Sequence, residues 1–339
     1  MTAMLRPATA DDADGIWELL APAAGELIGM ASLPSSATAA KQICADTAET
    51  VAELATSSFR MADGQHRRLL FVVCEPDGSP LGLTGVTFKQ AVPNLAVRVT
   101  TSEDGTGLIM RSSSIPWTRT ELDSSFLGAP ARGRGLGTLL SRGRFMFLQL
   151  VRSQIPNMVA SHLRGRFDSA GFAPFWRCFG GHLAPQWRTS TEAELALLAN
   201  PDRLAELAGH VRPLTAEVLD SLGPVNEASM PAFHLLRAEG MKPNGMYDPI
   251  DGGPTVIADL GDTITGQFRT HGRAELGAAG PTDALVSPAA IDRFRVIRTG
   301  VTIDEASTIT LDTEVAKAAG IEPRALLAVA PLAPANGDV

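Results

Sequence analysis

Aromatic and sulfur-containing ligand residues are scarce in this 339-residue chain. Aromatic residues make up 5% of it, with a single tyrosine. The cysteines are three in number, far apart, and without C-x-x-C spacing, which excludes a disulfide framework and a cysteine-based zinc site. We therefore expect reduced thiols at Cys44, Cys74 and Cys178. The six histidines include no H-x-x-x-H pair, so we expect no catalytic metal.

An excess of basic charge and a long apolar run are also missing. The chain has 37 acidic residues against 29 basic ones, a net charge of -8, which disfavours non-specific binding to nucleic acid. No stretch reaches the roughly 18 apolar residues of a membrane span. Acidic residues follow the amino terminus before any apolar run of signal-peptide length. We expect a soluble, cytoplasmic protein with no membrane partner.

The apolar residues that are present follow the periods of short strands and helices. Hydrophobic residues make up 45% of the chain, enough for a sizeable core and, at roughly 150 residues per domain, for about two domains. The order of elements is strand, two helices, three strands, a glycine-rich turn, a helix, a strand and a short helix. We expect a helical extension at about 190–240, a looser linker at 270–283 and short β-rich runs near the carboxyl end.

A glycine- and arginine-rich turn, Arg132-Gly133-Arg134-Gly135-Leu136-Gly137, follows a predicted strand and opens an amphipathic helix. A helix amino terminus leaves backbone N–H groups unpaired and attracts phosphate, and glycine lets a ligand approach the backbone closely. A dinucleotide fold would instead need G-x-G-x-x-G after the first strand. The turn resembles the pyrophosphate loop of Gcn5-related N-acetyltransferases, which hold coenzyme A through main-chain amides.

Local charge agrees with a phosphorylated ligand at this turn. Seven arginines and no acidic residue occur from Arg132 to Arg166, in a chain that is acidic overall. Arg132 and Arg134 lie in the turn and are expected to bind the phosphates of the ligand. Arg144 and Arg152 are expected on a solvated face of the helix.

Several further blocks resemble the arginine N-succinyltransferase family, which moves a succinyl group from succinyl-CoA to the α-amino group of arginine. The similarity covers most of residues 1–260. Its most specific blocks are Ser32-Leu33-Pro34, Leu139-Leu140-Ser141, Arg144-Phe145-Met146-Phe147, Arg164-Gly165 with Asp168 and Gly171, Pro174-Phe175-Trp176, Glu239-Gly240-Met241 and Asp251-Gly252-Gly253-Pro254.

This resemblance implies an α+β fold: an α/β/α sandwich with a mixed, mostly antiparallel sheet at residues 1–260, followed by a small β-rich subdomain at 261–339. It implies succinyl-CoA as co-substrate and an oligomer, either of identical chains or with a paralogous subunit. The expected cofactor-binding residues are Ser125, Phe126, Leu127, Arg132, Gly133, Arg134, Gly135, Leu136 and Gly137. Ser32, Leu33, Pro34 and Asp251 are expected substrate-binding residues, although local turn geometry also explains them.

The chain departs from the family at the position of its proton-transferring histidine, which is Asn226 here. Asparagine does not titrate near neutral pH and cannot act as a general base. Glu121, Asp123 and Glu227 are alternative bases, and His234 lies eight residues after Asn226 on a predicted helix, about two turns away. We list Asn226, Glu121 and His234 as candidate catalytic residues.

Two alternatives to an active arginine N-succinyltransferase stay open. The chain is either a catalytically impaired paralogue that pairs with an active subunit, which Asn226 favours, or an acyltransferase for a different amine or acyl donor.

Overall fold

The computed structural model describes residues 3–26, 32–101, 108–113, 115–168, 171–179, 196–197, 200 and 214–332. Over these residues the strands form one sheet whose members pair in the order β11-β14-β10-β13-β12-β1-β2-β3-β6-β7-β9-β8-β4-β5. No helix in these ranges is long and apolar enough to cross a bilayer.

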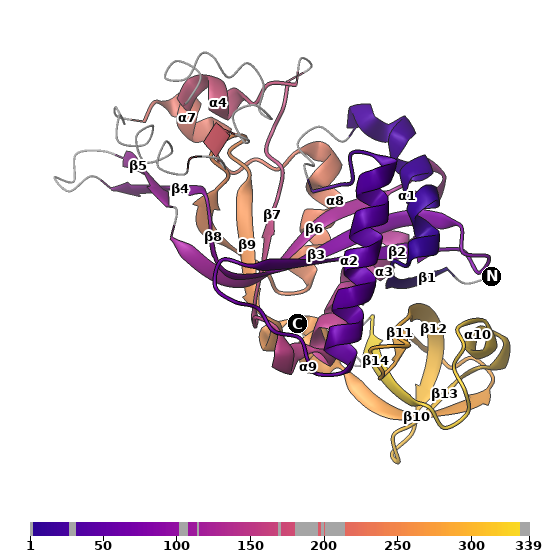
Figure 1. The fold of residues 1–339 in the computed structure, drawn as a ribbon. Coiled ribbons are helices and arrows are strands. Elements are labelled where there is room, and N and C mark those ends of the chain that lie inside the picture. Colours follow the sequence, from indigo (N-terminus) through magenta and orange to yellow (C-terminus); the bar gives the residue numbers. More distant parts are fainter. Residues whose placement is uncertain are drawn as a thin grey trace.

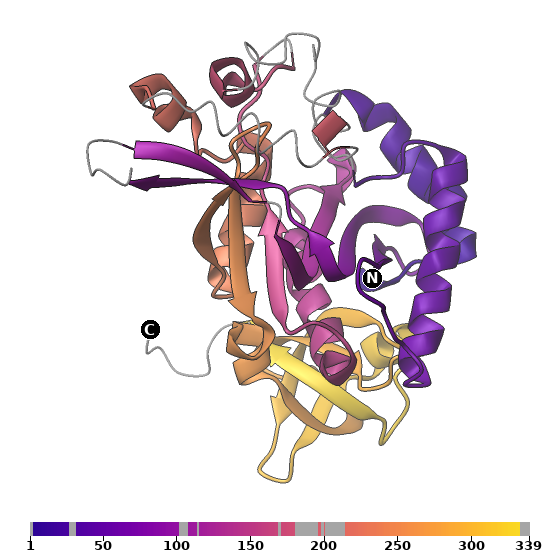
Figure 2. The ribbon, with the colours of Figure 1, turned by 60° about the vertical axis from the view of Figure 1, so that its left-hand side comes forward.

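The main part of the sheet has the spatial order β1-β2-β3-β6-β7-β9-β8-β4-β5. Its neighbouring strands are antiparallel except for the parallel pair β6–β7. The sequence predicts an antiparallel hairpin from the apolar runs 69–74 and 81–88, and it is present as β2 and β3. Residues 90–118, whose weak periodicity predicts an irregular or strand-rich insertion, contain the β4–β5 hairpin, which projects from the sheet (Figure 2). The strands of this main part of the sheet are β1 (Met4–Pro7), β2 (His66–Cys74), β3 (Pro80–Pro93), β4 (Ala96–Thr101), β5 (Leu108–Ser113), β6 (Pro116–Leu127), β7 (Met158–His162), β8 (Lys242–Tyr247) and β9 (Pro254–Asp259).

Helices cover both faces of this sheet (Figure 1). Alternate residues of a strand point to opposite faces: Leu70 packs with α1 and α2, whereas Leu69 and Phe71 pack with α3. The expected mixed sheet with helices packed against it is therefore confirmed. The helices are α1 (Ala13–Leu20), α2 (Ala37–Ala55), α3 (Leu136–Leu150), α4 (Pro174–Phe179), α7 (Ala216–Ser221), α8 (Met230–Ala238) and α9 (Ile264–Phe268), with 3₁₀ turns η1 (Ala10–Asp12), η2 (Ala21–Glu26), η3 (Ala129–Ala131), η4 (Arg152–Gln154), η5 (Glu227–Ser229) and η6 (Leu260–Asp262). α7 and α8 fall in the predicted helical extension, and most of residues 190–213 lie outside the described ranges.

The carboxyl-terminal strands close into a small barrel, because β11 pairs with β12 as well as with β14. An apolar cluster that includes Val286, Val301 and Leu311 fills it. The looser linker expected at 270–283 was wrong, since Thr270–Gly277 is a barrel strand with alternating buried and exposed residues. The barrel consists of β10 (Thr270–Gly277), β11 (Thr282–Pro288), β12 (Val296–Ile303), β13 (Thr308–Asp312), α10 (Thr313–Ala318) and β14 (Leu326–Pro331). The predicted boundary near residue 260 stays a prediction.

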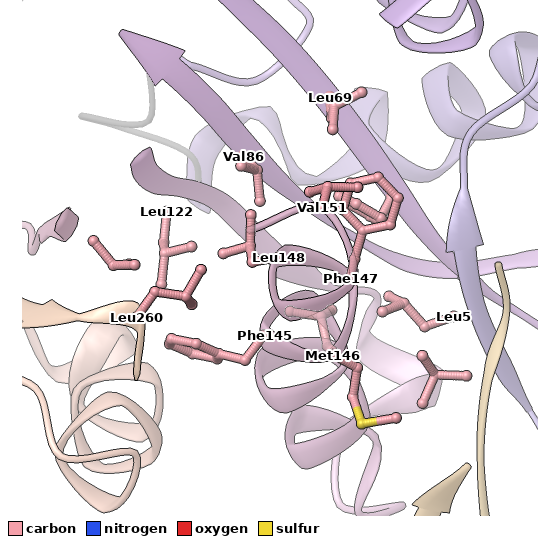
Figure 3. Close-up of a cluster of buried hydrophobic side chains, with 14 of the residues drawn as sticks. Leu5, Leu69, Val86, Leu122, Phe145, Met146, Phe147, Leu148, Val151 and Leu260 are labelled. Atoms are coloured by element: carbon pink, nitrogen blue, oxygen red, sulfur yellow. The ribbon is translucent and has the colours of Figure 1, made fainter. Parts of the chain in front are cut away.

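Helix α3 is the central element of the core (Figure 3). Every residue from Leu139 to Gln149 is buried, because α3 packs on the sheet, on α8 and α9, and on the barrel. Phe147 stacks edge-on against Phe71 of β2, with ring centroids 5.1 Å apart. Burial on all sides fixes the position of the helix and therefore of the turn that precedes it.

Candidate active site

The site begins where strands β6 and β7 separate. They pair only at Thr120↔Val159 and Glu121↔Ala160, and the Ser161 hydroxyl then donates to the Leu122 carbonyl at 3.0 Å. β7 ends at His162, whereas β6 continues to Leu127. Between Asp123 and Leu127, β6 pairs with β3 on one side only in the described structure, so its other edge offers backbone N–H and C=O groups to a ligand.

A bulge in β6 lies at this fork. The register of β6 against β3 shifts at Ser124, whose φ of 55° is left-handed. Such a conformation costs a non-glycine residue about 1–3 kcal/mol and is typical of functional sites. The Ser124 hydroxyl lies 3.0 Å from the Ser32 carbonyl oxygen and 2.9 Å from the Ser32 hydroxyl. The segment that contains Ser32 is thereby held against the fork.

A cavity of about 710 Å³ extends from the fork to the amino terminus of α3. It brings together the predicted cofactor-binding residues except Arg134, whose guanidinium instead forms an ion pair with Glu75 at 2.7 Å. Arg132 donates from Nε to the Leu127 carbonyl at 3.1 Å and covers the Phe126 ring. The wall of the cavity consists of Ser125, Phe126, Leu127, Arg132, Gly133, Gly135, Leu136, Gly137, Thr138, Leu140, Ser141, Arg144, Arg164, Ala228, Pro231, Ala232, His234 and Leu235.

The turn before α3 has the geometry of an anion site. Gly133 and Gly135 have φ angles of 78° and 74°, which glycine adopts without strain. The N-cap residue Gly135 has no side chain to cap the helix, and among the described residues no atom beyond the chain neighbours lies within 4 Å of the position that a Cβ on Gly133 would take. The first N–H groups of α3 are therefore available to a ligand that approaches over Gly133.

Arg144 places a buried positive charge in the wall of the same cavity. It is 3% exposed, and its Nη1 makes only long contacts of 3.3 and 3.4 Å to the Gly85 and Asp123 carbonyl oxygens. Burial lowers the pKa of Arg144 to about 10, which leaves it charged at neutral pH. No described carboxylate lies within ion-pair distance of Arg144, although the nearby charge of Asp123 partly offsets the effect of burial on this pKa. The solvated helix face expected for Arg144 was wrong.

A second, polar cavity of about 250 Å³ adjoins the fork from the other side, and Arg164 lines both cavities. It gathers residues from segments far apart in the sequence. Its polar wall comprises Ser32, Lys89, Asn94, Arg119, Glu121, Asp123, His162, Arg164, Asp248 and Asp251.

Glu121 is the charged centre of this polar cavity. Its Oε2 lies 2.8 Å from Lys89 Nζ, 3.0 Å from Arg119 Nη2 and 3.7 Å from His162 Nε2. Burial alone would raise the pKa of Glu121, but His162, Lys89 and Arg119 together hold that pKa well below its usual value. Glu121 is therefore ionised and surrounded by cationic side chains. Because these cations stabilise the carboxylate, Glu121 is a poor proton acceptor.

His162 is among the residues of the site that sequence reasoning missed, together with Lys89, Arg119 and Asp248. Its Nδ1 lies 2.9 Å from the hydroxyl oxygen of Thr255, a buried residue of β9. The only local signal was a histidine at the end of a predicted strand. Its contacts with Glu121 and Thr255 indicate a role in the site, and these two residues are 41 and 93 positions away in the sequence.

Asn226 has a structural role in this chain. Its side chain caps η5 by accepting the Ala228 N–H at 3.0 Å, and its own N–H donates to the Arg164 carbonyl at 2.9 Å. Neither cavity includes Asn226 in its wall. His234 is exposed on α8 and borders the larger cavity.

The predicted substrate-binding residues separate into two groups. Ser32 and Asp251 line the polar cavity, and Asp251 is 8% exposed with Oδ1 accepting the Gly253 N–H at 2.8 Å. Leu33 and Pro34 are buried, and Leu33 packs in the cluster beneath α1 and α2. Within the described residues no group of three His, Cys, Asp or Glu side chains is arranged to hold a metal ion.

Comparison with known proteins identifies the same region. A family model described as "Arginine N-succinyltransferase beta subunit" matches residues 110–265, which contain the fork, the turn and the wall of the larger cavity. Part of the polar cavity lies outside this match, at Ser32, Lys89 and Asn94. Proteins named arginine N-succinyltransferase from Shigella sonnei and Escherichia coli K12 are 30% and 31% identical over 148 and 145 residues. Each match covers 42% of this chain and 42% of the relative, so the chain matches less than half the length of these curated relatives.

The fold of the whole chain has a solved counterpart. The structure titled arginine/ornithine succinyltransferase subunit AI from Pseudomonas aeruginosa covers 98% of this chain and 99% of its own, with a TM-score of 0.79 and 20% identity. That likeness shows the fold, the barrel region included. Residues 110–265 match the arginine N-succinyltransferase family, and over these residues the resemblance expected from the sequence is confirmed.

Proposed function

We propose that this protein is a cytoplasmic enzyme of the Gcn5-related type that transfers a succinyl group from succinyl-CoA to the α-amino group of arginine. The observation that carries the proposal is the pair of cavities that meet at the β6–β7 fork and share Arg164. One cavity fits a long phosphorylated thioester and the other a small polar amine. A thioester carbonyl at the fork is within reach of both.

Coenzyme A occupies the larger cavity in this proposal. Its pyrophosphate accepts hydrogen bonds from the backbone N–H groups around Gly135 and Leu136, where the dipole of α3 adds to the attraction. Arg132 lies beside that position. The pantetheine arm follows the free edge of β6 from Leu127 to Ser125, because its amides pair with strand backbone. This order of contacts directs the thioester toward the fork.

The carboxylate of the succinyl group forms an ion pair with the buried guanidinium of Arg144 in this proposal. A charged acceptor is the partner that such a desolvated cation needs, and an acetyl group offers none. Arg164 lines the same wall. These charges favour a dicarboxylic acyl group over a simple alkanoyl one.

The acceptor occupies the polar cavity. The carboxylates of Asp123, Asp248 and Asp251 in its wall suit the guanidinium of arginine, and Lys89 suits the α-carboxylate. The α-ammonium group loses a proton, and its nitrogen forms a bond to the thioester carbon. The C–S bond then breaks, and the coenzyme leaves as a thiol after taking up the second proton from nitrogen.

A second candidate function is a paralogue with weakened catalysis that assembles with an active subunit, which Asn226 favours. Free thiol release from succinyl-CoA in the presence of arginine separates the two functions. Release by the wild-type chain supports the enzyme, and replacing arginine by ornithine or lysine tests the acceptor. Release only after Asn226→His supports the paralogue.

Binding of the co-substrate is tested separately by calorimetric titration with CoA. We expect heat of binding for the folded wild-type chain. A folded chain that gives no heat with CoA or succinyl-CoA would overturn the proposed function.

A further inference from the structure

We infer that His162 is the general base of the proposed reaction, in place of the histidine that the family has at the position of Asn226. This inference rests on the proposed function and assigns its proton-transfer step to one residue. His162 stands at the end of β7, where β6 and β7 separate, and it lines the polar cavity. It is 27% exposed on its side chain, so the ring is both held and accessible.

The ring is oriented from both sides. Nδ1 faces the buried Thr255 hydroxyl at 2.9 Å, and when Nδ1 carries the proton it donates to that oxygen. Nε2 is then free to accept a proton. Glu121 Oε2 lies 3.7 Å from Nε2, and its negative charge stabilises the imidazolium that forms. The arrangement of an acceptor nitrogen, an orienting hydrogen bond and a nearby carboxylate matches the requirements of a histidine base.

Other groups in the cavity are less suited to this step. Glu121 is ionised and forms ion pairs with Lys89 and Arg119, which lower its affinity for a proton. Asp123 accepts a hydrogen bond from the Thr87 hydroxyl at 2.7 Å and lies 3.3 Å from Arg68. Asp248 accepts backbone N–H groups from Ile250 and Asp251. Asn226 has no titrating group.

The charged groups that face His162 come from four segments. They are Lys89 on β3, Arg119, Glu121 and Asp123 on β6, Arg164 after β7, and Asp248 and Asp251 between β8 and β9. The wall around the ring therefore holds both carboxylates and cations.

In the step itself, one N–H bond of the acceptor's ammonium breaks and its proton goes to His162 Nε2. The nitrogen lone pair attacks the thioester carbon, the C–S bond breaks, and the second nitrogen proton goes to the departing sulfur. His162 returns its proton to solvent. The products are the amide, free CoA and one proton, and no oxidant or further reactant is needed.

The test compares steady-state kinetics of His162→Gln with the wild-type chain, using succinyl-CoA, arginine and thiol detection. We expect kcat to fall about 100-fold or more at neutral pH, the usual range for loss of a general base, while KM for succinyl-CoA changes little. The deficit should narrow as pH rises into the range where the acceptor's α-ammonium group loses its proton unaided. A purely structural role would give a deficit that does not depend on pH in this way.

His271→Gln is the matched control, because His271 is exposed on the barrel strand β10 and lines neither cavity. Calorimetry with CoA shows whether His162→Gln keeps the folded cofactor site, and His162→Asn gives a second variant if it does not. An active wild-type chain whose His162 variants keep kcat and the wild-type pH profile overturns this assignment alone. A wild-type chain that releases no thiol overturns the proposed function together with it.

Discussion

The backbones of Gly165 and Gly253 pass so close to each other that neither residue has room for a side chain. A Cβ on Gly253 would lie 1.9 Å from the Leu163 carbonyl oxygen and 2.6 Å from the Gly165 nitrogen. This contact joins the segment after β7, which includes Arg164, to the turn that includes Asp251. The two glycine-containing blocks of the family pattern therefore meet in space and hold the wall of the polar cavity.

Substituting Gly253→Ala should destabilise the fold by about 1–3 kcal/mol, because the added methyl group overlaps backbone that cannot move independently. Urea unfolding followed by circular dichroism measures the change. Gly137→Ala is a suitable control, since its Cβ would meet nothing closer than the Leu235 side chain at 3.5 Å. Equal stability of Gly253→Ala and the wild type would show that the two backbones can separate without cost.

Gly133→Ala and Gly135→Ala should each weaken CoA binding about tenfold. A left-handed backbone costs a residue with a Cβ roughly 1–2 kcal/mol, and relaxing that strain moves the amides that face the ligand. Titration calorimetry with CoA reports the dissociation constant. Gly78→Ala carries the same backbone penalty at φ 91° in the β2–β3 turn, away from the cavity, and should leave CoA affinity unchanged.

Arg144→Met should change acyl selectivity rather than overall binding. Loss of a charged hydrogen-bond donor costs about 1.5–3 kcal/mol, so kcat/KM for succinyl-CoA should fall roughly 10- to 100-fold relative to acetyl-CoA. The ratio of the two values is the useful quantity, because it does not depend on the fraction of folded protein. A parallel fall for both thioesters would contradict contact between Arg144 and the succinyl carboxylate.

Glu121→Gln should destabilise the protein at neutral pH by about 3 kcal/mol, because Lys89 and the buried Arg119 lose their carboxylate. The folded-state pKa of Glu121 lies below its usual value of 4.5. The ionised carboxylate therefore stabilises the wild type fully above about that value, and the benefit is lost as pH falls further. Urea unfolding at pH 7 and pH 3 should show the difference between variant and wild type shrinking at the lower pH. A constant difference would contradict it.

Local sequence patterns predicted the elements that build the cofactor cavity. The turn at 132–137, the strand before it and the helix after it are each encoded by consecutive residues, as is the β2–β3 hairpin. Closure of the barrel through β11 and β12 was not predictable in this way, because strand pairing between distant segments leaves no periodic signal.

The candidate site shows the same limit more sharply. Gly133 and Gly135 can be recognised from their neighbours in the chain, whereas His162 acquires its role from Glu121 and Thr255, which only folding brings near. Arg144 was misplaced because a charged residue on a helix is usually solvated. Nothing in its local pattern shows that the sheet, α8 and the barrel enclose α3.

Strand β12 belongs to two structures at once, because Val296 and Ile297 pair with β1 of the main sheet while residues 297–303 pair with the barrel strands β11 and β13. Just before it, Phe294 reaches Phe147 of α3, with ring centroids 5.0 Å apart. A chain shortened before β10 would expose an unpaired edge at β1 and an apolar hollow against α3, both of which promote aggregation. Expression of the amino-terminal part alone is therefore expected to give insoluble material, and the whole chain to melt in a single cooperative transition.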